Sequence, residues 1–150
     1  MEKESITKSA AETQELGGRL ATEILAGTSG SRVILLFGDL GAGKTTFTQG
    51  LLRGFGVEGP YTSPTFLIMK KYETKTTNHK LQTKNVYHID AYRVDAEDII
   101  SLGWEEMIAD PQNVIIVEWA DRIEKIIPKD SIRIRFEWVD EEKRKIFFKN

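Results

Sequence analysis

The chain has 150 residues, 40% hydrophobic and 29% charged, a composition that predicts one globular domain with a hydrophobic core over residues 1–150. Its formal net charge of -2 gives no overall basic field for nucleic acid, so we expect any contact with RNA to be local or made through a partner protein. Without cysteine the chain has no disulfide partner and no thiol catalysis, and without a run of transmembrane length or a signal-like start it is expected in the cytoplasm, away from membranes.

The first third of the chain predicts a helix, a buried strand and a second helix. A capping box at residues 9–12, followed by apolar residues at helical spacing, predicts an amphipathic helix that ends before Gly27. The uninterrupted apolar run Val33–Phe37 predicts a buried parallel strand. The next helix is expected to reach about Phe55 and to end at a flanking glycine.

The rest of the chain predicts short strands that alternate with helices. We expect strands at 66–72, 85–90 and 114–117, helices at 95–103 and 120–127, and a final hairpin of 131–138 with 144–149. The polar segment 74–85 has no apolar period and is expected to be a flexible hairpin loop. This alternation predicts an α/β fold, a three-layer sandwich around a mostly parallel central sheet with a C-terminal β-hairpin.

The most informative motif lies between the first buried strand and the helix after it. Residues 38–45 read Gly-Asp-Leu-Gly-Ala-Gly-Lys-Thr, which fits the phosphate-binding pattern G-x-x-x-x-G-K-[ST] at each fixed position. A strand that leads through such a loop to a helix N-terminus lets successive backbone N–H groups converge on a phosphate. The motif therefore predicts a P-loop NTPase-like domain that binds a nucleoside triphosphate. The expected binding residues are Gly38, Asp39, Leu40, Gly41, Ala42, Gly43, Lys44, Thr45 and Thr46.

Within this loop, Lys44 is expected to reach the β- and γ-phosphates, and the Thr45 hydroxyl to ligate Mg²⁺. Two acids at predicted strand ends are candidates to complete the metal site. Glu118 follows four apolar residues in the Walker-B manner, and Asp90 ends the strand before it. His88 faces the same side of its strand as Asp90 and either orders a water or phosphate or packs as a histidine bonded to the backbone. Arg93 either stabilises transition-state charge or forms a structural ion pair.

The P-loop alone leaves several classes of protein open. A regulatory GTPase would carry Asn-Lys-x-Asp and Asp-x-x-Gly, and a cassette ATPase a Ser-Gly-Gly signature, none of which occurs. A small-molecule kinase is the main rival, although the most lid-like segment, 74–85, contains lysines and no arginine. A nucleotide-switched binding module is the third class. Threonine and serine hydroxyls at 62–65, Thr65 among them, lie where P-loop enzymes often sense the γ-phosphate.

The motifs in combination resemble one family. They are GDLGAGKTT at 38–46, TSPTF at 62–66, HIDAYR at 88–93 and EW at 118–119, with ETQELG at 12–17 and LGWEE at 102–106. In this order and spacing they resemble the TsaE (YjeE) family over nearly the whole chain, since other P-loop families share only the first motif. The segment 74–85 departs from the family by its length.

The resemblance implies an ATPase of the tRNA threonylcarbamoyladenosine pathway, with ATP and Mg²⁺ as cofactors. Its implied partners are the TsaD and TsaB proteins, which attach a threonylcarbamoyl group to the adenosine beside the anticodon, so that tRNA is met only through the complex. The isolated protein is expected to hydrolyse ATP slowly. Carried over by motif, Lys44 and Thr45 serve phosphate and Mg²⁺, Glu118 completes the metal site, and Asp90 assists hydrolysis. Thr65 falls in a switch-like loop, and residues 5–13 are expected near the base.

Overall fold

The computed structural model describes residues 2–28, 31–61, 67–74 and 83–149, and within them seven strands form one sheet in the order β1-β7-β6-β2-β5-β4-β3. The strands are β1 (Glu2–Thr7), β2 (Val33–Phe37), β3 (Met69–Glu73), β4 (Asn85–Asp90), β5 (Asn113–Glu118), β6 (Ile132–Trp138) and β7 (Arg144–Lys149). The four central strands, β6, β2, β5 and β4, are parallel. Both margins are antiparallel, with β3 against β4 on one side and β7 and β1 beyond β6 on the other.

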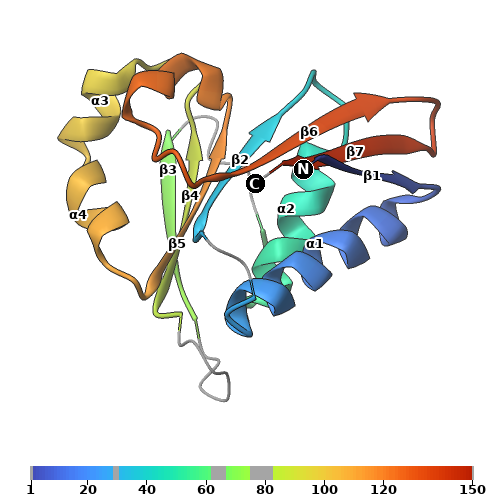
Figure 1. Cartoon of the computed structure of the whole chain (residues 1–150), viewed down its shortest axis with the longest axis horizontal. Coiled ribbons are helices and arrows are strands. Elements are labelled where there is room, and N and C mark those ends of the chain that lie inside the picture. The colour runs from blue at the N-terminus through green and yellow to red at the C-terminus, as the bar shows by residue number, and fades with distance from the viewer. Residues whose placement is uncertain (1, 29–30, 62–66, 75–82, 150) are drawn as a thin grey trace.

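Helices cover the sheet from two sides, which confirms the predicted three-layer sandwich (Figure 1). Helices α1 (Ala10–Leu25) and α2 (Lys44–Gly54) form one outer layer. Helices α3 (Ala96–Ser101) and α4 (Trp104–Ala109), with the 3₁₀ helix η1 (Ala120–Ile126), form the other. Among the described residues, no helix has the length and apolar character needed to cross a membrane.

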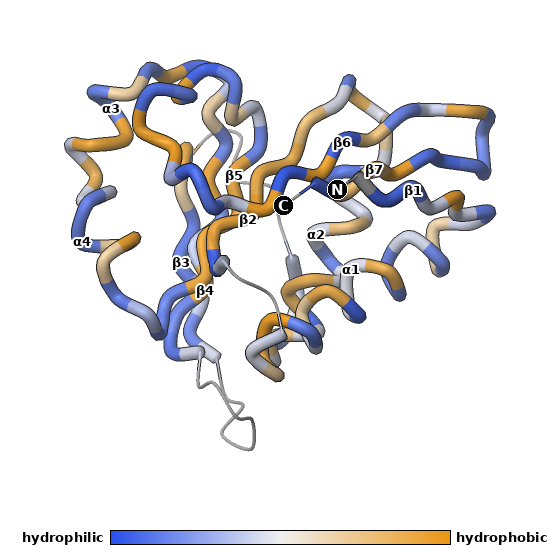
Figure 2. Tube along the Cα trace, in the orientation of Figure 1, coloured by the Kyte–Doolittle hydropathy of each residue, from blue (hydrophilic) through white to orange (hydrophobic). Residues whose placement is uncertain are grey.

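Each face of the central sheet has its own hydrophobic core. Side chains alternate along β2, so Ile34 and Leu36 join the core under α1 and α2, while Val33 and Leu35 join the core under α3, α4 and η1. Burial on both faces explains why β2 reads as an uninterrupted apolar run. Figure 2 shows the same hydrophobic colouring along the central strands, with hydrophilic residues toward the exposed segments.

Helices α1 and α2 touch backbone to backbone. A Cβ added at Gly50 would lie 2.0 Å from the carbonyl oxygen of Gln14, and one added at Gly17 would lie 2.4 Å from that of Phe47. The side chains of Gln14 and Gln49 join the two helices by a hydrogen bond of 3.0 Å. Only glycine fits at these crossing points, so α1 is fixed closely against the helix that follows the P-loop.

Two predicted elements differ from the structure, and one helix was not predicted. The strand expected at 66–72 is observed as Met69–Glu73, because Ile68 takes a φ of 66° and turns the chain just before the strand. The helix expected at 95–103 ends at Ser101, because Gly103 adopts a left-handed φ of 96° and starts α4, which the sequence analysis missed. Its predicted start is confirmed, since Asp95 caps α3.

Strand β1 was also missed. All of its residues except Ile6 are polar or charged, and it lies at the margin of the sheet, paired with β7 only. Such a strand carries little of the apolar alternation by which strands are recognised. The ends of the predicted 74–85 loop are joined by a hydrogen bond of 3.1 Å from the Thr74 N–H to the Lys84 carbonyl. Residues 75–82 lie outside the described part of the chain.

Candidate nucleotide-binding site

The P-loop connects the carboxyl end of β2 to the N-terminus of α2, as the motif predicts. Its shape depends on glycine. Gly38 has a φ of 141°, and a Cβ there would lie 2.7 Å from the carbonyl oxygen of Phe136 on β6. Gly43 is the N-cap of α2 in a left-handed conformation and offers no side-chain cap. The first N–H groups of α2 are therefore free of a side-chain acceptor at the capping position, as a helix end that receives a phosphate should be.

Lys44 is a desolvated cation among acids. The residue is 5% exposed, and its ammonium donates to the Gly38 carbonyl at 2.5 Å and lies 4.0 Å from the ring centroid of Trp119. Burial lowers the pKa of Lys44 below its ordinary value, an effect that nearby carboxylates, Glu118 and Asp90 foremost, only partly offset. An anionic acceptor such as a phosphate would form a stronger hydrogen bond with this ammonium than the neutral carbonyl does.

The two acids end their strands, as the sequence predicts, and the structure places them opposite each other. Asp90 on β4 and Glu118 on β5 are partners in the parallel register, and both are buried. The Asp90 Oδ1 accepts the backbone N–H of Tyr92 at 3.0 Å. The Glu118 Oε2 is 2.8 Å from the Nε2 of His88, so in this structure His88 contacts a carboxylate, a partner that the sequence analysis did not consider.

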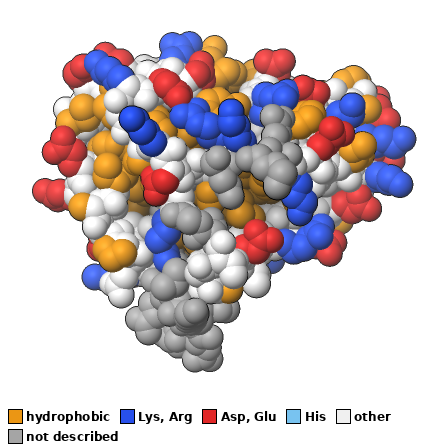
Figure 3. Space-filling view, in the orientation of Figure 1, with side chains coloured by type: hydrophobic (Ala, Val, Ile, Leu, Met, Phe, Trp, Pro, Cys, Tyr) orange, Lys and Arg blue, Asp and Glu red, His pale blue; other side chains and the backbone are white. Residues whose placement is uncertain are grey.

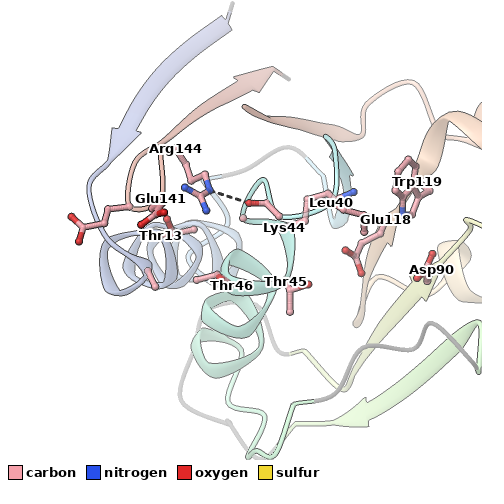
Figure 4. A pocket seen from close by; sticks show the side chains of 14 residues that line it. Thr13, Leu40, Lys44, Thr45, Thr46, Asp90, Glu118, Trp119, Glu141 and Arg144 are labelled. Carbon is pink, nitrogen blue, oxygen red and sulfur yellow. Dashed lines mark hydrogen bonds between the residues drawn. The ribbon is translucent and has the colours of Figure 1, made fainter. Parts of the chain in front are cut away.

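The P-loop and the acids line a single cavity of about 390 Å³. At one end lie Lys44, Thr45, Asp90 and Glu118, with Trp119 beside them (Figure 4). This arrangement brings together predicted phosphate-binding, metal-binding and catalytic residues from the P-loop, α2, β4 and β5.

The opposite end of the cavity contains two residues that the sequence analysis did not assign, Glu141 and Arg144. Arg144, from the start of β7, lies there with Glu141 and with Thr13 of α1 (Figure 4). The Arg144 Nε donates to the Gly41 carbonyl at 3.2 Å, which ties the β6–β7 hairpin to the P-loop. Because β6 runs parallel to β2, its carboxyl end meets the same edge of the sheet as the P-loop. The hairpin was predicted, but not this neighbour, and without it Arg144 could not be placed.

The remaining predicted residues occupy several environments. Leu40, at the tip of the P-loop, is 87% exposed, and Asp39 beside it is also exposed. Arg93 has an exposed side chain after β4. Thr13 lines the cavity, and the expected place of residues 5–13 near the base stays a prediction. Thr65 lies outside the described residues, so its role stays a prediction.

The donor set suits Mg²⁺ bound together with a nucleotide. Among the described residues, no group of three or more His, Cys, Asp or Glu side chains is placed to hold a metal ion. Mg²⁺ usually binds through one or two protein ligands, waters and substrate phosphates rather than through a complete protein cage. The Thr45 hydroxyl and the Glu118 carboxylate, which line the same cavity, fit that mode of binding.

Comparison with known proteins identifies the family. The family model described as "Threonylcarbamoyl adenosine biosynthesis protein TsaE" matches residues 7–146. The chain belongs to the TsaE family. The match contains every element from α1 to β6, and the TsaE resemblance seen in the motifs is thereby confirmed.

Individual relatives agree with this assignment. The tRNA threonylcarbamoyladenosine biosynthesis protein TsaE of Bacillus subtilis (strain 168) is 39% identical over 116 residues, which are 77% of this chain and 68% of the relative. The TsaE of Streptomyces coelicolor is 36% identical over 126 residues, 83% of this chain and 78% of the relative. The crystal structure of Bacillus subtilis YdiB superposes with a TM-score of 0.72 at 30% identity, covering 99% of this chain and 84% of that one.

Proposed function

We propose that this TsaE family member is the ATP-hydrolysing subunit of tRNA threonylcarbamoyladenosine biosynthesis and acts with TsaD and TsaB. The family supports the pathway. One observation carries the ATPase activity: Lys44, Thr45, Asp90 and Glu118 line one cavity. A P-loop, a metal-binding hydroxyl and strand-end carboxylates are parts that P-loop NTPases use for phosphoryl transfer to water.

In this proposal the site binds ATP through the P-loop. Backbone N–H groups at the start of α2 and the Lys44 ammonium hold the phosphates, and Lys44 exchanges its contact with the Gly38 carbonyl for the β- and γ-phosphates. Thr45 and Glu118 hold Mg²⁺. Bound Mg²⁺ neutralises charge on the phosphate oxygens.

Asp90 is proposed to orient the attacking water. Its carboxylate is fixed through Oδ1 by the Tyr92 N–H, and it lines the cavity beside Glu118. A fixed acceptor near the terminal phosphate can align a water for in-line attack. In this proposal the two acids have different roles: Asp90 orients the water and Glu118 binds the metal.

The cavity also suggests why the protein should be slow alone. The cationic side chains that line it, among the described residues, are Lys44 and Arg144. Arg144 lies at the end away from Asp90 and Glu118 and donates to backbone carbonyls there (Figure 4). A second cation on the developing charge is worth about 10³–10⁵ in rate in related enzymes. We propose that TsaD and TsaB complete the site, by supplying such a group or by ordering the loop that contains Thr65.

Contact with tRNA is proposed to be indirect. The chain has a formal net charge of -2, and positive and negative side chains are interspersed on the face drawn in Figure 3. Such a mixed surface offers no broad basic field for a polyanion. Binding to tRNA through the TsaD and TsaB proteins is consistent with this distribution.

A pull-down with the tagged protein, with and without ATP, tests the function. We expect TsaD and TsaB on the beads, and phosphate release from ATP that rises when both are added. Lys44→Ala serves as the inactive control. Phosphate transfer to a small-molecule acceptor would instead favour a kinase, and nucleotide-dependent capture without hydrolysis would favour a binding module.

A further inference from the structure

A buried histidine, His88, contacts Glu118 behind the cavity and has no role in the proposed chemistry. His88 is 4% exposed and Glu118 5% exposed, and the His88 Nε2 lies 2.8 Å from the Glu118 Oε2. Both residues belong to neighbouring central strands, β4 and β5, whose positions are fixed by the parallel ladder. This contact is therefore part of the rigid framework of the site rather than a surface pair.

The strand register explains how His88 reaches Glu118. Asp90 is the register partner of Glu118, and His88 precedes Asp90 by two residues on the same strand. Side chains two apart on a strand share one face of the sheet, so His88 and Asp90 approach Glu118 from the same side. Asp90 remains at the strand end, while His88 holds the glutamate from one step deeper.

The hydrogen in this contact can be assigned from its partners. A carboxylate oxygen only accepts, so Nε2 is the donor. The other ring nitrogen, Nδ1, is buried and has no hydrogen-bond partner among the described residues. A buried N–H without an acceptor is costly, whereas a lone pair there is less so. We therefore place the hydrogen of this contact on Nε2.

We propose that His88 is a positioning residue that presents the Glu118 carboxylate to Mg²⁺, an inference that rests on the proposed function of the site. The hydrogen bond engages Oε2 and leaves Oε1 for the metal. Glutamate has one more rotatable bond than the aspartate common at this position, so a restraint on its orientation saves more conformational entropy on metal binding. Hydrogen bonds to metal ligands commonly change metal affinity by about 10–100-fold.

Three substitutions separate this role from simple packing. His88→Leu removes the donor and puts an apolar side chain of similar bulk in its place. His88→Gln places an amide N–H near the position of Nε2, whereas in His88→Asn the amide is too short to replace it. ADP affinity is measured by calorimetry across a Mg²⁺ series and in EDTA, together with thermal unfolding of each variant.

We expect the Mg²⁺ concentration that half-restores tight ADP binding to rise about 10–100-fold in His88→Leu and His88→Asn, and to recover largely in His88→Gln. Affinity in EDTA should stay within about twofold of wild type, since the P-loop itself is unchanged. A wild-type Mg²⁺ response in folded His88→Leu would overturn the inference, as would an equal loss of affinity with and without Mg²⁺. If His88→Leu does not fold, the difference between Asn and Gln decides.

A double-mutant cycle shows whether His88 acts through Glu118. In a Glu118→Gln background, His88→Leu should cause no further shift in the Mg²⁺ response, because the carboxylate it positions is gone. A full additional shift would contradict the proposal. Failure of the parent function is distinguishable: wild-type protein whose ADP binding ignores Mg²⁺ would refute the metal site itself, and the inference with it.

Discussion

Replacing Lys44 by methionine should weaken nucleotide binding but leave the stability of the nucleotide-free fold equal or higher. The Lys44 ammonium is buried beside the Gly38 carbonyl and the ring of Trp119. In the proposed complex it turns to phosphate oxygens. Methionine keeps the length of the aliphatic chain but cannot donate a hydrogen bond, so Lys44→Met removes the phosphate contact with little change in packing.

The expected loss of affinity follows from the strength of a charged contact. A hydrogen bond to a charged group contributes about 1.5–3 kcal/mol, and the ammonium gives up its contact with Gly38 on binding. We expect a net loss of about 2–3 kcal/mol in this partly desolvated site. At about 1.4 kcal/mol for each tenfold change, the Kd for ATP should rise roughly 30- to 140-fold.

The fold without nucleotide should not lose stability. Burial is the main cause that lowers the pKa of Lys44 from its ordinary value of 10.5, so the folded protein holds this proton less tightly than the unfolded chain. The charge therefore destabilises the fold fully below the lowered pKa, and this cost disappears as the pH rises toward 10.5. At pH 7 the Tm of Lys44→Met should equal or exceed that of wild type, and any gain should shrink at alkaline pH.

Calorimetry with ATP and thermal unfolding measure the two effects on the same samples. Lys129→Met removes one positive charge from an exposed position before β6, at the opposite edge of the sheet, and should change neither quantity. Unchanged ATP affinity in folded Lys44→Met would refute the assignment of the P-loop. A clearly lower Tm would show that the contacts of the ammonium outweigh its burial cost.

Three further outcomes are expected. Glu118→Ala should weaken the Mg²⁺-dependent part of nucleotide binding, whereas Asp90→Ala should mainly lower turnover; a Mg²⁺ titration of both variants would exchange the roles if Asp90→Ala proved metal-deficient. Steady-state phosphate release should be slow for the protein alone and rise clearly with TsaD and TsaB, and fast partner-independent turnover would contradict an incomplete site. Gly50→Ala should lower the Tm, since its Cβ would lie 2.0 Å from the Gln14 oxygen, while Gly41→Ala, whose Cβ meets nothing within 4 Å, tests strain at φ 79° alone and should cost less.

The fold could be predicted where the sequence has strong local signals. Apolar runs marked the buried strands, and the P-loop marked the turn between β2 and α2. Strand β1 was not predicted, because an exposed strand at the margin of a sheet needs no apolar alternation. Helix α4 was not predicted as a separate helix, because the break at Gly103 depends on a left-handed conformation that a lone glycine permits but does not require.

The site was predictable in its motif and incomplete in its neighbours. Lys44, Thr45, Asp90 and Glu118 were found because each follows from a loop pattern or a strand end. The contact between His88 and Glu118 depends on β4 lying beside β5 in register, and local sequence does not state that pairing. Arg144 likewise required the placement of β6 beside β2. Sheet order is a long-range property, which a single sequence leaves open.

Because α1 and α2 cross at glycines, a continuous ring of contacts starts at the P-loop and returns to it. From the P-loop the ring runs along α2, crosses at Gly50 to α1, and follows the chain back into β1. Strand β1 is hydrogen-bonded to β7, and Arg144 on β7 returns to the Gly41 carbonyl of the P-loop. Close-packed backbones transmit displacement with little slack. Helix α1 and strand β1 are therefore joined to the phosphate-binding loop by contacts that the nucleotide does not make.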